Sequence, residues 1–226
     1  FWRFACYIYR IRRLTNNELT WISSLYVIIL WEFASAITPS VVGGTAVAVF
    51  ILWKEGIKPG KAIGFVFVTA IFDNLFFVVF APVTLVLGMD AIFPSTVAST
   101  SMVENGLSYL FFISYALVSL YTFIMFFAIF INPRLFKWIL LKITSVRYLK
   151  KWRYAAYERG TEMVIASEQL KGMGQRFWID IGVATFFIWT SRYLLLNFLM
   201  AAFQPINISE HILIFGKQII LWVVML

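Results

Sequence analysis

Cysteine and histidine are almost missing from this chain, which has one of each, Cys6 and His211. A single cysteine excludes an internal disulfide, and without a CxxC motif or a Cys/His cluster the sequence offers no metal site. The sequence also lacks a Ser/His/Asp set, a Walker loop and a GxGxxG motif. It therefore has few residues that could serve conventional acid-base catalysis. We therefore predict no cofactor, and a transporter-like or accessory protein rather than an enzyme.

Charged residues are scarce as well, at 13% of the 226 residues against 62% hydrophobic and 19% aromatic residues. With a mean hydropathy of +0.85, the chain is far more apolar than a soluble domain, which predicts an integral membrane protein. The net charge of +8 does not indicate nucleic acid as a partner, because no basic stripe interleaved with stacking aromatics lies outside the flanks of apolar segments. The basic residues are interpreted as topology signals and contacts to anionic lipids.

Apolar stretches of membrane-spanning length divide the chain. Crossing the hydrocarbon core takes about 20 helical residues, and the predicted spans lie at residues 62–88, 107–131 and 178–203, with the start of a further span at 211–226. Residues 1–20 are predicted to form an interfacial N-terminal segment, in which aromatics alternate with arginines. The predicted fold class is an all-α, polytopic transmembrane helical bundle forming one domain over residues 1–226, expected to be part of a longer polypeptide.

The distribution of Lys and Arg predicts which segments face the cytoplasm. Residues 132–177 contain ten basic and three acidic residues, so this segment is predicted to be cytoplasmic and, in part, an amphipathic surface helix. Residues 89–106 contain no Lys or Arg and are placed outside, whereas residues 54–61 and the N-terminal arginines are placed inside. An even number of crossings must connect two cytoplasmic ends. Residues 21–53 hold less than two full spans, so we predict a re-entrant hairpin there.

An irregular segment interrupts the apolar sequence of this hairpin. Pro39 lacks a backbone N–H and disfavours the α region for Thr38, while Gly43 and Gly44 permit dihedral angles that other residues avoid. In hydrocarbon, irregular backbone survives only where protein buries it or where it lines a polar cavity, and hydroxyls such as that of Ser40 satisfy freed backbone groups. We expect a helix to begin at Gly44 with its N–H groups directed at the break, which suits phosphate. The alternative is a tight turn whose glycines only allow close helix packing.

The charged residues Glu32, Asp73 and Arg192 lie inside apolar stretches, and Asn74 follows Asp73. A charge at the centre of a transmembrane helix costs about 2.5–3.5 kcal/mol on insertion scales, so we expect these side chains to face the bundle interior. In one interpretation they line a polar cavity in which Arg192 attracts a phosphate and Glu32 or Asp73 attracts an amine. In the other they form a buried ion pair that fixes helix register. Lys54 is mainly a topology charge, with headgroup capture as a minor alternative.

One stretch of this sequence resembles a known family over roughly residues 31–75. The resemblance rests on Thr38-Pro39-Ser40, Gly43-Gly44, Lys54-Glu55-Gly56-Ile57, Lys61-Ala62 and Asp73. Together they look like the transmembrane region of the lysylphosphatidylglycerol synthases, which also occurs as stand-alone flippase-like proteins of the bacterial cytoplasmic membrane. The resemblance implies a polytopic helical fold with re-entrant elements that moves lipids, including aminoacylated phospholipids, between leaflets. Many relatives carry Glu or another polar residue directly after the glycines, whereas this chain has Thr45 and Ala46 there.

We predict from these observations that the chain translocates or binds a phospholipid with a charged headgroup. The headgroup would enter a cavity built from residues 38–45, Glu32, Asp73 and Arg192, while the tails stay in the bilayer. The alternative is a non-catalytic structural or accessory subunit of a larger membrane complex, which leaves protein partners or an oligomer open. A membrane-embedded transferase ranks last, because no metal site or nucleophile is visible.

Overall fold

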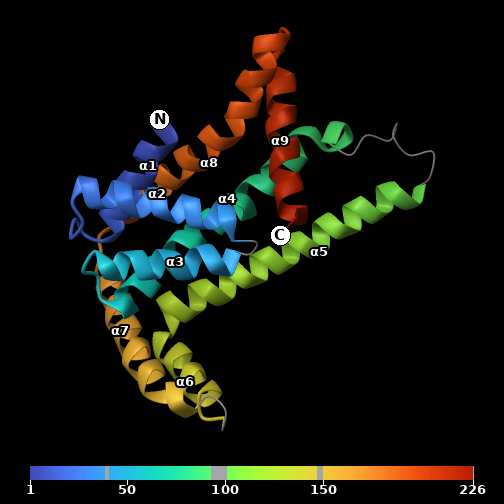
Figure 1. Ribbon diagram of the computed structural model, residues 1–226. Helices are drawn as coiled ribbons and strands as arrows, with labels where there is room; N and C mark the ends of the chain where they lie inside the picture. Colours follow the sequence, from blue (N-terminus) through green and yellow to red (C-terminus); the bar gives the residue numbers. More distant parts are fainter. Residues whose placement is uncertain (39–40, 93–100, 147–149, 226) are drawn as a thin grey trace. The chain divides into compact units, whose positions relative to one another are not determined.

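The computed structural model describes residues 1–38, 41–92, 101–146 and 150–225 (Figure 1). Helices make up most of the described chain, which contains no strand, so the predicted all-α fold class is confirmed. Four helices are long and apolar enough to cross a membrane, at Pro59–Val86, Ser108–Ile131, Gln175–Phe203 and Ile208–Met225. They coincide with the predicted spans, although three of them begin three residues earlier than expected. The chain is an integral membrane protein.

The helices form two compact units, and the helices at Pro59–Ile92, Ser101–Phe126 and Gln175–Phe203 each belong partly to both. Unit 1 comprises residues 1–72 and 124–185, and unit 2 comprises residues 73–123 and 186–226. The expectation of a single domain stays a prediction. The helices are α1 (Trp2–Leu14), α2 (Trp21–Ile37), α3 (Val41–Lys54), α4 (Pro59–Ile92), α5 (Ser101–Phe126), α6 (Pro133–Ile143), α7 (Arg153–Lys171), α8 (Gln175–Phe203) and α9 (Ile208–Met225), with a π-helical turn at Phe127–Ile131 and a 3-10 turn at Lys150–Trp152.

Helices α2 and α3 pack side by side as a hairpin within unit 1 (Figure 1). The hydroxyl of Thr20 accepts a hydrogen bond of 3.1 Å from the Ser23 N–H and caps α2. With 17 and 14 residues, both helices are shorter than the roughly 20 residues that a crossing requires. Their length fits the predicted re-entrant hairpin, whose position in a membrane stays a prediction.

The end of α3 and the start of α4 are fixed by two glycines. Gly56 has a φ of +93°, a conformation that suits glycine, and it ends α3 while the Ile57 N–H donates back to the Leu52 carbonyl at 3.0 Å. Gly60 lies against α7. A Cβ atom at position 60 would lie 2.1 Å from the Cβ of Glu162, so only glycine permits this approach.

The basic segment predicted at 132–177 contains a helical hairpin. Helices α6 and α7 pack against each other, and a Cβ atom at Gly160 of α7 would lie 3.0 Å from the Cγ of Lys137 on α6. Helix α6 exposes apolar side chains along one side, Leu135, Trp138, Ile139 and Ile143. This exposed apolar side fits an amphipathic helix. Its position at a membrane surface and the cytoplasmic side of the hairpin stay predictions.

Unit 2 has a core of aromatic side chains and two hydrogen-bonded amides, of which Asn197 is buried. Phe77, which is fully buried, stacks on Trp222 with ring centroids 3.5 Å apart and meets Trp189 edge-on at 4.6 Å. Asn197, 1% exposed, donates to the His211 carbonyl at 2.7 Å, and Gln218 donates to the Tyr193 carbonyl at 3.1 Å. These contacts join α8 to α4 and α9.

Candidate functional site

The predicted break between α2 and α3 is shorter than expected. Helix α3 already begins at Val41, so Gly43 and Gly44 lie inside a helix, and the expectation that a helix begins at Gly44 is wrong. A Cβ atom at Gly44 would lie 2.4 Å from the Ser35 Oγ, so this glycine allows α3 to approach α2 closely. Thr38 ends α2, where its hydroxyl donates to the Ala34 carbonyl at 2.7 Å. Pro39 and Ser40 lie outside the described residues.

Glu32, the first predicted intramembrane charge, forms an ion pair with Arg3 of α1. Both side chains are partly exposed, at 33% for Glu32 and 27% for Arg3. Glu32 therefore forms an ion pair, but its partner is Arg3 rather than Arg192, and the pair is partly exposed rather than buried. Lys54, another candidate, is exposed at the end of α3 and lies over the Phe50 and Trp53 rings at 5.7 and 5.8 Å, which suits an interfacial anchor.

Two further arginines of α1 bind α8 in unit 1. Arg10 is 3% exposed and donates to the Thr185 hydroxyl at 3.0 Å, with its guanidinium 5.2 Å from the Tyr7 ring. Arg13 donates to the Asp180 carboxylate at 3.0 Å. Sequence analysis missed these roles and missed Asp180 altogether. The available signal was the spacing, because residues 3, 10 and 13 share one side of a helix.

The other two predicted charges meet through one tryptophan in unit 2. The Trp189 indole N–H donates to the Asp73 carboxylate at 2.9 Å, and the Arg192 guanidinium lies 5.4 Å from the Trp189 ring. Trp189 is 7% exposed, whereas Arg192 is exposed, so the expectation that Arg192 faces the interior is wrong. Asn74 beside Asp73 is half-buried.

Asp73 and Arg192 both lie near the middle of apolar helices. Asp73 is residue 15 of the 28 in the candidate span Pro59–Val86, and Arg192 is residue 18 of the 29 in Gln175–Phe203. The cation-π contact with Trp189 offsets part of the cost of an arginine at that depth. An exposed guanidinium in this position is a strong donor toward a phosphate oxygen.

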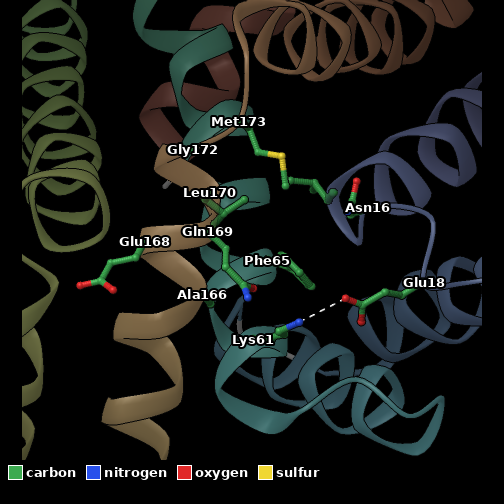
Figure 2. Close-up of a pocket in the computed structure, with 11 residues that line it drawn as sticks. Asn16, Glu18, Lys61, Phe65, Ala166, Glu168, Gln169, Leu170, Gly172 and Met173 are labelled. Carbon is green, nitrogen blue, oxygen red and sulfur yellow. Dashed lines mark hydrogen bonds and ion pairs between the residues drawn. The ribbon is translucent and has the colours of Figure 1, made fainter.

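A pocket of about 390 Å³ lies elsewhere in unit 1, lined by none of the predicted site residues. It forms where the turn after α1, the first turns of α4 and the end of α7 meet (Figure 2). Lys61 and Glu18 face each other across it, with Nζ 3.1 Å from Oε1 (Figure 2). Its lining is completed by Leu14, Asn16, Phe65, Ala166, Glu168, Gln169, Leu170, Gly172 and Met173. The pocket therefore has Lys61 as its basic residue, Glu18 and Glu168 as its acidic residues, and an apolar wall.

A second hollow of unit 1, of about 410 Å³, is an apolar groove between α3, α4, α6 and α7. It includes Thr45 and Ala46, which follow the glycines of α3, and Arg159 is its charged residue. Such an apolar lining suits a hydrocarbon chain, and the Arg159 guanidinium lies beside it. Among the described residues, no three His, Cys, Asp or Glu side chains gather in a way that holds a metal ion.

The whole chain matches one family model, which describes the lysylphosphatidylglycerol synthase TM region and covers residues 2–226. The chain belongs to this family. The match extends the resemblance well beyond the stretch at 31–75 on which sequence analysis based it. No curated protein and no solved structure matches the chain. Membership in the lysylphosphatidylglycerol synthase TM-region family ties this membrane protein to phospholipid handling.

The motif residues that pointed to the lysylphosphatidylglycerol synthase TM-region family have structural roles in this member. Gly56 ends α3, and Ile57 is 2% exposed. Ala62 is fully buried, which leaves Lys61 to reach the pocket beside Glu18. The Gly60 N–H donates to the Glu162 carboxylate at 2.7 Å, so α7 supplies an acceptor at the start of α4. This stretch therefore fixes how α3, α4 and α7 meet and places one basic side chain in the pocket.

Proposed function

We propose that this protein binds the charged headgroup of a phospholipid within the membrane and lets it pass between the leaflets, as a flippase-like protein of a bacterial cytoplasmic membrane. The observation that carries the proposal is the cluster of Asp73, Trp189 and Arg192 at mid-length of two apolar helices. A headgroup that leaves water must find replacement partners for its charges. Arg192 is the partner of the phosphate, and Asp73 is the partner of a headgroup amine.

Membership in the lysylphosphatidylglycerol synthase TM-region family supports this assignment, because it ties the chain to phospholipids. The apolar groove beside Arg159 also supports it, because its lining suits an acyl chain. Glu32 has no part in the proposal, since its pairing with Arg3 favours a structural role. Protein partners and an oligomeric state are left open by the proposal.

The experiment that tests the proposal is lipid transfer in liposomes that contain the purified protein. Fluorescent phosphatidylethanolamine and phosphatidylglycerol are compared, with protein-free liposomes as the blank. Asp73→Asn retains an acceptor for the Trp189 N–H but removes the charge. It should slow transfer of the amine-bearing lipid by about tenfold, equivalent to roughly 1.4 kcal/mol, and should change transfer of phosphatidylglycerol little.

Absence of transfer for every lipid, from wild-type protein shown to be folded, would contradict the proposal. That result would favour the accessory-subunit alternative, in which these helices serve assembly in a larger membrane complex. Equal slowing of both lipids by Asp73→Asn would remove Asp73 from the role of amine partner.

A further inference from the structure

The pocket around Lys61 and Glu18 holds an ion pair that a ligand could exchange. Their side chains are 21% and 45% exposed, so both ends of the pair are reachable from the pocket. A ligand with one charge would leave either the ammonium or the carboxylate without a partner. A ligand that carries both charges gives Lys61 and Glu18 one new partner each, so neither charge is left unpaired.

The surrounding helices reinforce this polarity. Helices α1 and α7 end at the pocket, next to Leu14 and Gly172, and the partial negative charge of a helix C-terminus favours a cation. Glu168 also lines the pocket, where it is paired with Arg134 at 3.6 Å. Lys61 is the basic residue in the lining. An anionic group therefore has one place to bind, at Lys61, and an ammonium group has its place at Glu18.

The rest of the pocket matches the part of a lipid that joins headgroup to chains. Leu14 and Leu170 are each 1% exposed, and Phe65 and Met173 extend the apolar wall (Figure 2). A volume of about 390 Å³ falls in the range of about 300–1,000 Å³ that small-molecule sites occupy. The N-terminal segment, residues 54–61 and residues 132–177, all predicted to be cytoplasmic, flank or contribute to this pocket.

We propose that this pocket binds a zwitterionic phospholipid headgroup, with the phosphate on Lys61 and the ammonium group on Glu18. The inference rests on the proposed function in that the ligand is a membrane phospholipid. It adds a docking site in unit 1 that is separate in sequence from Asp73 and Arg192. It also adds a preference for headgroups that carry both charges.

The test is calorimetric titration of the full chain in maltoside micelles with dihexanoyl phosphatidylethanolamine, dihexanoyl phosphatidylglycerol and chain-free glycerophosphoethanolamine. Wild-type protein should bind the zwitterionic lipid about tenfold more tightly than the anionic one. Glu18→Gln should reverse this order, because it leaves Lys61 free for a phosphate without an amine. Lys61→Met should weaken binding of both lipids. Lys58→Met and Glu158→Gln, exposed changes outside the pocket, are the matched controls and should bind as wild type does.

Three results would overturn the inference. The first is equal affinity of the wild-type protein for the two lipids. The second is an unchanged order of the two affinities in Glu18→Gln. The third is a loss of affinity in the control variants as large as that in the pocket variants. Equal affinity for the chain-free ester would assign the pocket to a soluble phosphate ester and overturn the lipid assignment. If the protein transfers lipid in liposomes but binds no lipid in the calorimetric titration, this inference alone would be overturned. If the protein binds the zwitterionic lipid in the titration but transfers no lipid in liposomes, only the proposed function would be overturned.

Discussion

Trp189 donates its indole N–H to the Asp73 carboxylate at 2.9 Å, and this bond places a carboxylate of α4 beside α8 within unit 2. The ring of the same tryptophan lies under the Arg192 guanidinium. One aromatic side chain therefore holds an acidic and a basic residue of two apolar helices in one cluster. Because hydrogen bonds of charged groups gain strength in a low-dielectric setting, the tryptophan is expected to matter for both stability and function.

Replacing Trp189 by Phe tests this bond. The variant keeps an aromatic ring but leaves Asp73 without the indole donor, and hydrogen bonds to charged groups contribute about 1.5–3 kcal/mol. We expect the free energy of unfolding in mixed micelles to fall by about that amount. Trp222→Phe is the control, since Trp222 stacks on Phe77 in the same unit. A loss in Trp222→Phe as large as that in Trp189→Phe would contradict a specific role of the bond.

Gly60→Ala should destabilise unit 1 strongly. The added Cβ would lie 2.1 Å from the Glu162 Cβ and 2.9 Å from the Arg159 carbonyl oxygen, and overpacking of this kind costs about 1–3 kcal/mol. Gly64→Ala on the next turn of α4 is the matched control, because its Cβ would meet the Ala166 Cβ at an ordinary 3.5 Å. Thermal unfolding of both variants measures the difference. Equal midpoints would show that α4 and α7 do not approach closely at Gly60.

Arg13 and Asp180 should be energetically coupled across 167 residues of sequence. Two guanidinium nitrogens lie 3.0 and 2.9 Å from the same carboxylate oxygen, and partly exposed pairs contribute about 0.2–1 kcal/mol. A double-mutant cycle with Arg13→Gln and Asp180→Asn should give a coupling energy near the top of that range. The cycle of Arg12→Gln with Asp180→Asn should be additive, because Arg12 contacts Asn17 and Trp21. Additivity in both cycles would contradict the pair.

Labelling of introduced cysteines tests the predicted topology. In a Cys6→Ser background, which has no other cysteine, Ser145→Cys at the end of α6 should react with a membrane-impermeant maleimide only from the cytoplasmic side. Position 99, in the segment that lacks Lys and Arg, should react only from the opposite side when Ser99→Cys is introduced. Reaction of both thiols from the same side would refute the predicted orientation.

Hydropathy was enough to predict the membrane helices, because their apolar composition is a property of each stretch alone. The glycines at 43 and 44 misled the prediction of the break, since a glycine pair indicates both a helix end and a close helix contact. Gly44 allows the close helix contact, because Ser35 of α2 lies against it. That neighbour belongs to another helix. The pairing of Arg13 with Asp180 and the pocket at Lys61 likewise depend on which helices pack together, which no local pattern records. Trp189 is an apolar residue by composition, so its bond to Asp73 had no signal in the sequence.

The most direct test of the central claim is the rate of phospholipid transfer in liposomes by the Arg192→Ala variant, compared with the control variant Lys217→Ala. Both residues are exposed cations of unit 2, and both lie well inside candidate spans. If Arg192 binds the phosphate that all phospholipids share, its loss should slow transfer of every lipid by about tenfold or more, while Lys217→Ala should stay within about twofold of wild type. Transfer by Arg192→Ala at the wild-type rate, or an equal loss in Lys217→Ala, would contradict a headgroup path along Asp73, Trp189 and Arg192.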